Sequence, residues 1–205
     1  MPNQSHTARP TRDGVAGVAD AADLPPKPAP SPKSETFHIA LTGHRPGKLA
    51  GYDLGNLFYS NLRRHLMSII EAALKEHQNL TLHSGMALGA DTVWSEAIVN
   101  ARAMNPGRIT FVAEVPVMTQ SDRWVAATDK QRWALHIRIA DTVNVYADQY
   151  TPRCLWDRNE GMIDAADLLI AIWDGHPGGG TAGAVTYARR KDVPVQVLSP
   201  DVFRG

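Results

Sequence analysis

The sequence predicts an α/β fold in which a doubly wound, mostly parallel sheet of about six strands carries helices on both faces. Short apolar runs alternate with longer segments of helical periodicity over about 165 residues, as expected for parallel strands joined by crossover helices. The chain is 43% hydrophobic and 20% charged, which is typical of a globular domain. No internal repeat is present, so these observations favour one sheet rather than an array.

The predicted elements follow one another in strict order. The expected strands are the apolar runs at residues 37–41, 80–83, 109–115, 142–146, 168–173 and 195–198. The expected helices lie between them, at residues 56–77, 90–104, 121–139, 157–166 and 181–191. In the first of these, apolar residues recur every three or four positions, which indicates a buried stripe: Leu57, Phe58, Leu62, Leu66, Ile69, Ile70 and Leu74.

The chain divides into a leader at residues 1–35 and a ligand-binding domain at residues 36–205. The leader is rich in Ala, Pro and Ser and has no apolar periodicity, so we expect it to be disordered. A tether or dispensable segment is the favoured interpretation. A Pro-rich peptide ligand for a partner is the alternative.

Charge and hydropathy exclude several classes of partner. Lys and Arg together number 21, as do Asp and Glu, so the formal net charge is zero. Duplex nucleic acid and anionic membranes usually require a basic face, and neither partner is expected here. No apolar run approaches the roughly 20 residues of a membrane span, and the N-terminus lacks the apolar core of a signal peptide. We therefore expect a cytoplasmic protein.

Cysteine and metal chemistry contribute little to the prediction. Cys154 is the only cysteine, which excludes an intrachain disulfide and favours a reducing compartment. No His or Asp stands at a recognisable catalytic spacing from it, so a passive, partly buried thiol is favoured over a nucleophile. No His-rich cluster indicates a metal, and we expect neither a metal nor a cofactor.

The most informative segment is the glycine-rich turn after the fifth apolar run. That run leads into Asp174, then into Gly178, Gly179 and Gly180, and Thr181 begins a helical pattern. Glycines allow backbone N–H groups to approach a phosphate, and the helix dipole favours its negative charge. A plain turn is the alternative. The segment matches neither the P-loop nor the dinucleotide motif of dehydrogenases.

The first two apolar runs also end in loops suited to a ligand. Gly43, His44 and Arg45 follow the first run; Arg45 offers a planar fork for phosphate, whereas His44 is either a ligand contact or a structural residue. The candidates after the second run are Ser84, Gly85, Met86, Gly89 and Asp91. Ser84 and the N–H groups of this loop suit ribose hydroxyls or phosphate. Asp91 fits a sugar-binding role and a helix cap equally well.

Two further loops carry candidates with open alternatives. Trp124 suits stacking on a base, although a core position is more common at this spacing. Arg158 and Asn159 either project toward the strand ends or lie at the start of a helix that faces solvent. Glu114 and Glu160 are the candidate catalytic carboxylates, and Glu114 stands in an apolar run, where it needs a partner or solvent.

Together these loops resemble the SLOG superfamily, and within it the YpsA-like branch. The matching segments are residues 42–46 (TGHRP), residues 84–91 (SGMALGAD), Gln120 with Trp124, residues 158–162 (RNEGM), and Asp174 followed by residues 179–181 (GGT). The resemblance covers residues 37–198. It implies a Rossmann-like sheet that binds nucleotides or nucleotide-derived signals, ADP-ribose-type molecules among them. It also implies a dimer, because relatives often dimerise.

The resemblance includes relatives with different activities. LOG enzymes look like phosphoribohydrolases that use a glutamate three residues after the motif threonine, and DprA proteins bind single-stranded DNA. In this chain Arg158 matches the upstream arginine of the LOG enzymes, but Ala184 stands at the glutamate position. Alanine cannot transfer a proton, so the chain departs from the hydrolase pattern, and only Glu114 or Glu160 remain as substitutes.

We therefore expect a protein that senses or sequesters a nucleotide-like small molecule at the C-terminal edge of the sheet, for instance in bacterial or phage defence signalling. An enzyme is less favoured. The first alternative is a nucleotide N-glycoside hydrolase, and the second is a single-stranded DNA binder.

Overall fold

Strands and α-helices alternate along residues 36–204, which are the residues that the computed structural model describes. The leader expected at residues 1–35 lies outside them. The strands are β1 (Thr36–Gly43), β2 (Asn79–Ser84), β3 (Ile109–Val115), β4 (Thr142–Val145), β5 (Leu168–Ile172) and β6 (Val195–Leu198). The helices are α1 (Leu57–Glu76), α2 (Ala90–Met104), α3 (Ala127–Ile139), α4 (Pro152–Asp164) and α5 (Gly179–Arg190), with the 3-10 turns η1 (Pro46–Lys48) and η2 (Pro200–Phe203).

The six strands form one parallel sheet in the order β4-β3-β2-β1-β5-β6, which confirms the predicted fold class. The chain adds β2, β3 and β4 on one side of β1 and then returns to add β5 and β6 on the other. The strand order therefore reverses between β1 and β5, where Gly43 pairs with Ile172. In such sheets, ligands bind beyond the carboxyl ends of the strands at this switch point.

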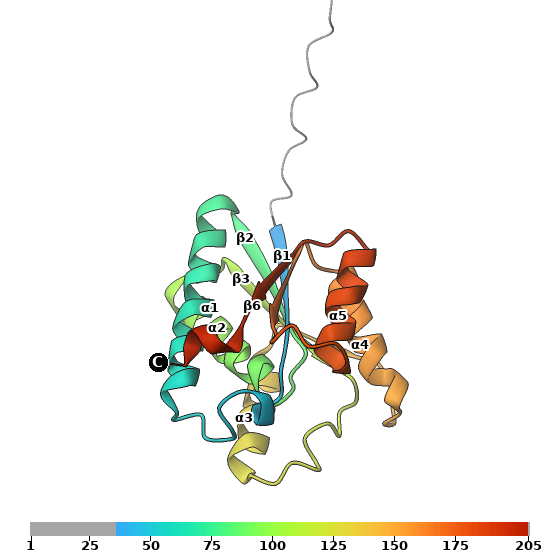
Figure 1. The fold of residues 1–205 in the computed structure, drawn as a ribbon. Helices are drawn as coiled ribbons and strands as arrows, with labels where there is room; N and C mark the ends of the chain where they lie inside the picture. The colour runs from blue at the N-terminus through green and yellow to red at the C-terminus, as the bar shows by residue number, and fades with distance from the viewer. Residues whose placement is uncertain (1–35, 205) are drawn as a thin grey trace, which may run out of the picture. The chain divides into compact units, whose positions relative to one another are not determined.

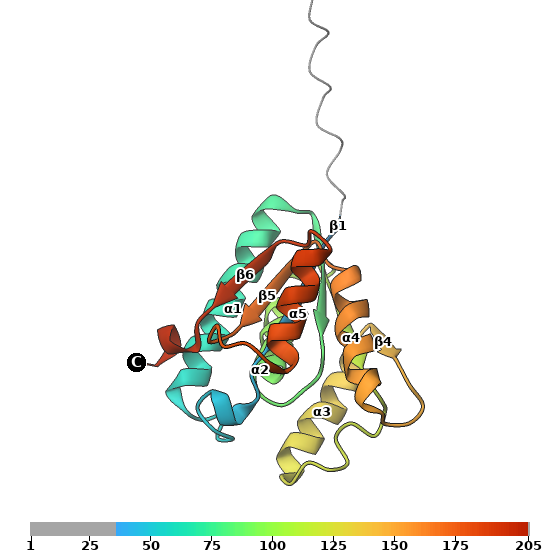
Figure 2. The same ribbon diagram turned by 45° about the vertical axis from the view of Figure 1, so that its right-hand side comes forward.

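Helices cover both faces of the sheet (Figures 1 and 2): α1 and α2 lie on one face, and α4 and α5 on the other. Successive β1 side chains point to opposite faces of the sheet and are buried on both, as expected for a central parallel strand. Ile39 and Leu41 belong to the core cluster that includes α1 and α2. Ala40 belongs to a smaller cluster with Met162 of α4 and Ala184 of α5.

Three helix starts differ from the sequence prediction. Helix α3 begins at Ala127 rather than at residue 121, because residues 119–124 form hydrogen-bonded turns. Helix α4 begins at Pro152 rather than at residue 157, because the Thr151 side chain caps it and proline suits its first position. Helix α5 begins at Gly179 rather than at residue 181. Within residues 36–204, no helix is long and apolar enough to cross a membrane.

Candidate ligand-binding site

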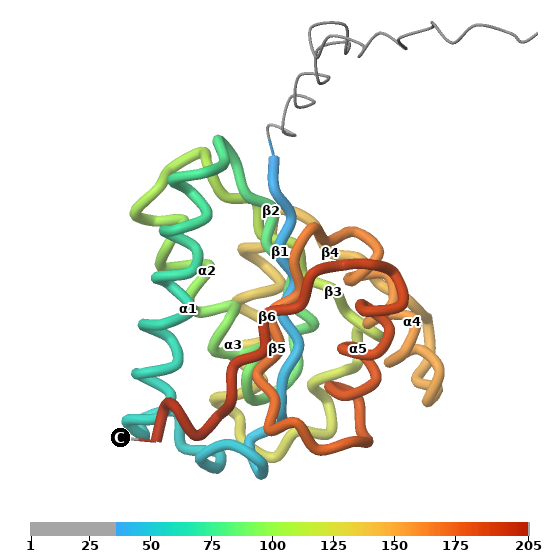
Figure 3. The backbone as a smooth tube through the Cα atoms, turned by 45° about the horizontal axis from the view of Figure 1, so that its top comes forward, coloured from blue at the N-terminus to red at the C-terminus, as the bar shows by residue number. Residues whose placement is uncertain are grey.

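A cavity of about 470 Å³ lies at the switch point, where the segments that follow β1 and β5 approach each other at the lower end of the sheet in Figure 3. The cavity brings together ten of the residues that the sequence singled out: Gly43, His44, Arg45, Asp91, Arg158, Asn159, Gly178, Gly179, Gly180 and Thr181. These residues come from the loops after β1 and β5, from α2, and from α4. The topology thus places four separate chain segments around one space.

The wall formed by the β5–α5 turn is rich in backbone N–H groups. Gly178 (φ 95°) and Gly179 (φ 81°) have positive φ angles, which glycine adopts without strain. Gly178 is the N-cap of α5, and no side chain caps this helix end. The first N–H groups of a helix have no partner within the helix, and they carry its positive dipole end. The turn is therefore suited to an anion, as the sequence predicted.

A buried ion pair forms the floor of the cavity. The Nη1 of Arg158, from α4, lies 3.3 Å from Oδ2 of Asp91 at the start of α2. Burial raises the pKa of Asp91, and the neighbouring Arg158 only partly offsets this effect. Arg158 is 6% exposed, and its Nε has no hydrogen-bond partner within residues 36–204. A buried donor without a partner is costly, and a guanidinium is a group that binds oxyanions well.

The positions of Asp91 and Arg158 exclude two structural interpretations that the sequence left open: a helix cap for Asp91 and a solvent-facing helix start for Arg158. Asp91 does not cap α2, because Gly89 is the N-cap and Asp91 lies in the first turn. Arg158 and Asn159 lie in the middle of α4 rather than at its start, so the interpretation as residues at a helix start was wrong. Both are buried, which also excludes the solvent-facing alternative.

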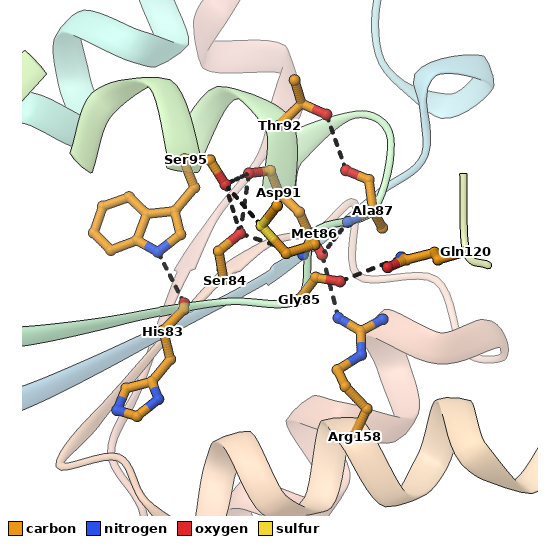
Figure 4. A network of polar contacts seen from close by, with 11 residues as sticks. His83, Ser84, Gly85, Met86, Ala87, Asp91, Thr92, Ser95, Gln120 and Arg158 are labelled. Carbon is orange, nitrogen blue, oxygen red and sulfur yellow. Dashed lines mark hydrogen bonds and ion pairs between the residues drawn. The ribbon is translucent and has the colours of Figure 1, made fainter. Parts of the chain in front are cut away.

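The β2–α2 loop packs against the ion pair between Asp91 and Arg158 (Figure 4). A Cβ at Gly85 would overlap Nη1 of Arg158, so only glycine leaves room for the guanidinium. Ser84 is fully buried and contacts the Ser95 hydroxyl at 2.9 Å. Met86 is buried with a φ of 57°, and Gly89 packs against the backbone after β1. Of the five candidates in this loop, only Asp91 lines the cavity.

A second cavity of about 500 Å³ adjoins the first, and the two share Arg45 and Leu155. Trp124 lines this second cavity and also packs against the core. Tyr150, Arg123 and Gln120 also line it. Trp124 therefore belongs both to the edge of the core and to the wall of this cavity. The glycines of the β5–α5 turn line the first cavity only, whereas Trp124 and Tyr150 line the second and not the first.

Both candidate catalytic carboxylates lie outside these cavities. Glu114 is 1% exposed and accepts hydrogen bonds from His83 (2.8 Å), Asn144 and Tyr146. Burial acts to raise the pKa of Glu114, but these hydrogen bonds outweigh it and hold the pKa below its ordinary value. Glu160 forms an ion pair with Arg153 at 3.2 Å on the outer side of α4. Asp174 lies beside the first cavity, where it contacts His44.

Sequence reasoning did not single out Lys48, Tyr52 and Leu155, which also line the first cavity. Lys48 and Tyr52 follow β1 within ten residues, so the rule that ligands lie beyond strand ends would have included them had it been extended past Arg45. Cys154 is buried, and its thiol lies 2.9 Å from the carbonyl oxygen of Thr151. Across residues 36–204, no group of three or more His, Cys, Asp or Glu side chains is arranged to hold a metal ion.

These features define a Rossmann-like α/β protein with a polar cavity at the switch point of its sheet. No protein-family model matches the sequence. The chain is 24% identical over 155 residues to the SPbeta prophage-derived protein YoqJ of Bacillus subtilis (strain 168), which covers 68% of this chain and 88% of YoqJ.

Two solved structures of DNA processing protein A (DprA) share the fold. The Helicobacter pylori protein, described for its single-stranded DNA binding mode, has a TM-score of 0.52 and 17% identity. The Streptococcus pneumoniae protein has a TM-score of 0.55 and 14% identity. These matches cover 79% and 80% of this chain but only 65% and 50% of the two DprA chains. At these identities the likeness concerns the fold alone.

Proposed function

We propose that this chain is a SLOG protein of the YpsA-like branch that binds a nucleotide or nucleotide-derived ligand. The observation that carries the proposal is that Arg158, a buried cation whose Nε has no partner among residues 36–204, lines the same cavity as the uncapped N-terminus of α5. Both features call for an oxyanion, and a phosphate satisfies both at once. Arg45 and Lys48 add positive charge to the same cavity.

The adjoining cavity supports a ligand that extends beyond its phosphates, such as an ADP-ribose-type molecule. With the phosphates on the glycine turn, a nucleoside would pass Arg45 and reach Trp124 and Tyr150. An aromatic ring beside a cation suits a nucleobase, because every base presents a π-face. Ligands of this class have polar groups on both sides of the phosphates, which matches the two-part shape of the space.

Binding without hydrolysis is the favoured activity, because among residues 36–204 no free carboxylate lines the first cavity, and Asp122 lines only the second. Asp91 is paired with Arg158, and Glu114 and Glu160 lie elsewhere. Ala184 lies on the buried face of α5, in the smaller core cluster. Release of a base from a nucleotide by the wild-type protein, abolished by Glu114→Gln or Glu160→Gln, would instead establish the N-glycoside hydrolase.

The decisive experiment is mass spectrometry of small molecules that co-purify with the protein, followed by calorimetric titration with AMP, ADP-ribose and a single-stranded oligonucleotide. We expect saturable ADP-ribose binding. Preference for the oligonucleotide, with an affinity that falls steeply with salt, would favour the DNA-binding alternative, for which the DprA-like fold is the supporting observation. Absence of binding to all three probes would contradict the proposed function.

Gly180→Ala tests whether the ligand phosphate binds at the glycine turn. A Cβ at Gly180 meets no atom closer than 4.0 Å, where it approaches Asn159, so the folded chain accommodates it. We expect the free energy of unfolding to stay equal or rise by about 0.5 kcal/mol, because alanine favours a helix over glycine. ADP-ribose affinity should fall at least tenfold, because the methyl group enters the anion-binding turn. Arg64→Ala, on the exposed surface of α1, is the control and should leave affinity unchanged.

A further inference from the structure

His44 has a fixed backbone and a ring that reaches the cavity at the switch point. It is 6% exposed and lines the first cavity beside the glycine turn. Its N–H donates to the carbonyl oxygen of Ile172 (3.1 Å), and its carbonyl oxygen accepts from the N–H of Ala90 (3.2 Å). These two bonds tie the residue to β5 and α2, so the ring has little freedom to leave the site.

Asp174 holds the ring of His44 in either protonation state. Oδ1 of Asp174 lies 2.9 Å from Nε2 of His44, and the backbone N–H of Asp174 lies 3.2 Å from the same nitrogen. When Nε2 carries a proton, it donates to Oδ1; when Nε2 is bare, it accepts from the N–H. One residue therefore satisfies both forms of the imidazole, and a proton can be gained or lost without moving the ring.

The other ring nitrogen is available to a ligand. Nδ1 of His44 contacts no hydrogen-bonding group of residues 36–204, although the ring lies in the cavity wall. In the imidazolium form Nδ1 is a donor suited to a phosphate oxygen. In the neutral form, the carboxylate oxygen Oδ1 of Asp174 at 2.9 Å favours the tautomer with its proton on Nε2, so Nδ1 is an acceptor and would repel that oxygen.

Several charged or titratable groups on neighbouring segments surround His44 and Asp174. Asp174 contacts Lys48 of η1 (3.7 Å) and His176 of its own loop (3.5 Å), and Arg45 follows His44 directly. Asp91 of α2 and Arg158 of α4 line the same cavity as His44. The backbone hydrogen bond from His176, together with His44 and Lys48, lowers the pKa of Asp174 to about 2. Asp174 is therefore an anion that lies against the His44 ring.

We propose that His44 and Asp174 form a proton-linked anion contact, in which His44 binds a ligand phosphate as the imidazolium and thereby couples ligand binding to proton uptake. This inference rests on the proposed function, because it concerns the same cavity. A ligand that binds the protonated form more tightly must draw protons from solution, and its affinity must rise as the pH falls through the range in which imidazoles titrate.

The test is calorimetric titration with ADP-ribose at pH 7 in two buffers of different ionisation enthalpy, together with affinity measurements at pH 6 and pH 8. The pyrophosphate of ADP-ribose has no titrating proton in this range, so proton uptake reports on the protein. For the wild-type protein we expect uptake of a fraction of a proton and an affinity about fivefold higher at pH 6 than at pH 8. His44→Asn should retain weaker binding with no uptake and a flat pH profile.

Two variants separate His44 from its neighbours. Asp174→Asn leaves the ring in place but removes the anion that favours the imidazolium, so uptake should fall. His65→Gln changes an exposed imidazole on α1, outside both cavities, and should keep the wild-type uptake. Binding without proton exchange in the wild-type protein, or equal uptake in His44→Asn, would overturn the inference and leave the proposed function intact. Absence of ADP-ribose and AMP binding at every pH would overturn both.

Discussion

At the scale of single residues, the site is organised around one buried guanidinium. Arg158 contacts Asp91, and Gly85 provides the space for it. A buried ion pair costs desolvation energy, and its geometry rarely repays that cost in stability. The unpartnered Nε makes Arg158 costlier still. The folded chain therefore holds a destabilising group in the place where an anionic ligand would use it, as expected for a binding site.

Removal of Arg158 alone should be strongly destabilising. Arg158→Met leaves Asp91 buried without its cation, and we expect the free energy of unfolding to fall by about 3 kcal/mol. Asp91→Asn combined with Arg158→Met removes both charges and should recover most of that loss. Urea denaturation of the wild-type protein, of Arg158→Met, of Asp91→Asn and of the double variant forms a double-mutant cycle. Equal stability of Arg158→Met and the double variant would show that Asp91 can be buried without Arg158 at no cost in free energy.

At the scale of elements, the face of β2 and β3 covered by α4 carries a polar layer instead of an apolar one. His83 lies between His38 (3.2 Å) and Glu114 (2.8 Å), and Tyr146 donates to Glu114 from beyond β4. Because one His–His contact needs a donor and an acceptor, the two rings cannot both be protonated at this distance without repulsion. Burial and His83 lower the pKa of His38.

The packing of α3 contributes a second acid-sensitive group. His136 is 5% exposed and packs edge-on against Phe111 of β3. Burial, with a contribution from Arg132, lowers the pKa of His136 to about 4. The unfolded chain then binds more protons than the folded chain between about pH 6.5 and pH 4. The contribution of the neutral His136 to the free energy of unfolding is therefore fully present above pH 6.5 and is lost as the pH falls through this window.

We expect the free energy of unfolding to fall by about 3 kcal/mol between pH 7 and pH 4 through His136 alone. His136→Leu should remove that part of the pH dependence, because leucine fills a similar buried volume and does not titrate. Urea denaturation at pH 4, 5, 6 and 7 measures the effect, and His176→Leu, at an exposed histidine, is the control. A His136→Leu protein with the wild-type pH profile would contradict this assignment.

At the scale of the whole molecule, the reversal of strand order decides where the loops meet. The segments after β1 and β5 belong to neighbouring strands, so residues 43–45 and 178–181 share one cavity despite their separation in sequence. The space then extends past Arg45 to the segment after β3, which holds Trp124. An extended ligand would thus span three strand ends, with its phosphates over the switch point.

This arrangement predicts that Trp124 acts on one part of the ligand only. Trp124→Ala should weaken ADP-ribose binding by about tenfold or more, because stacking on an aromatic ring contributes about 1–3 kcal/mol per base. Pyrophosphate, which needs only the first cavity, should bind with unchanged affinity. Calorimetric titration of both probes measures the difference, and Trp156→Ala, outside the two cavities, is the control. Equal losses for both probes would show that Trp124 acts through the fold.

The local signals in the sequence were sufficient for the elements and for much of the cavity wall. Apolar runs identified the six strands because buried parallel strands need continuous apolar residues, and the glycines after β5 identified a turn that lines the first cavity. The start of α4 was missed, since the Thr151 cap and Pro152 lie outside the apolar periodicity used to define the helix. The same error placed Arg158 at a helix end instead of at a buried position.

By itself, the sequence determined the fold class and the loops that face the carboxyl ends of the strands, because periodicity and glycine placement are local properties. Only the tertiary structure decided which residues of those loops reach the cavity. Ser84 and Glu114 looked as suitable as Asp91 and His44, yet the first two are buried in polar contacts within the protein. The distinction depends on which face of a strand or helix turns toward a neighbour, and that is set by packing between segments distant in sequence.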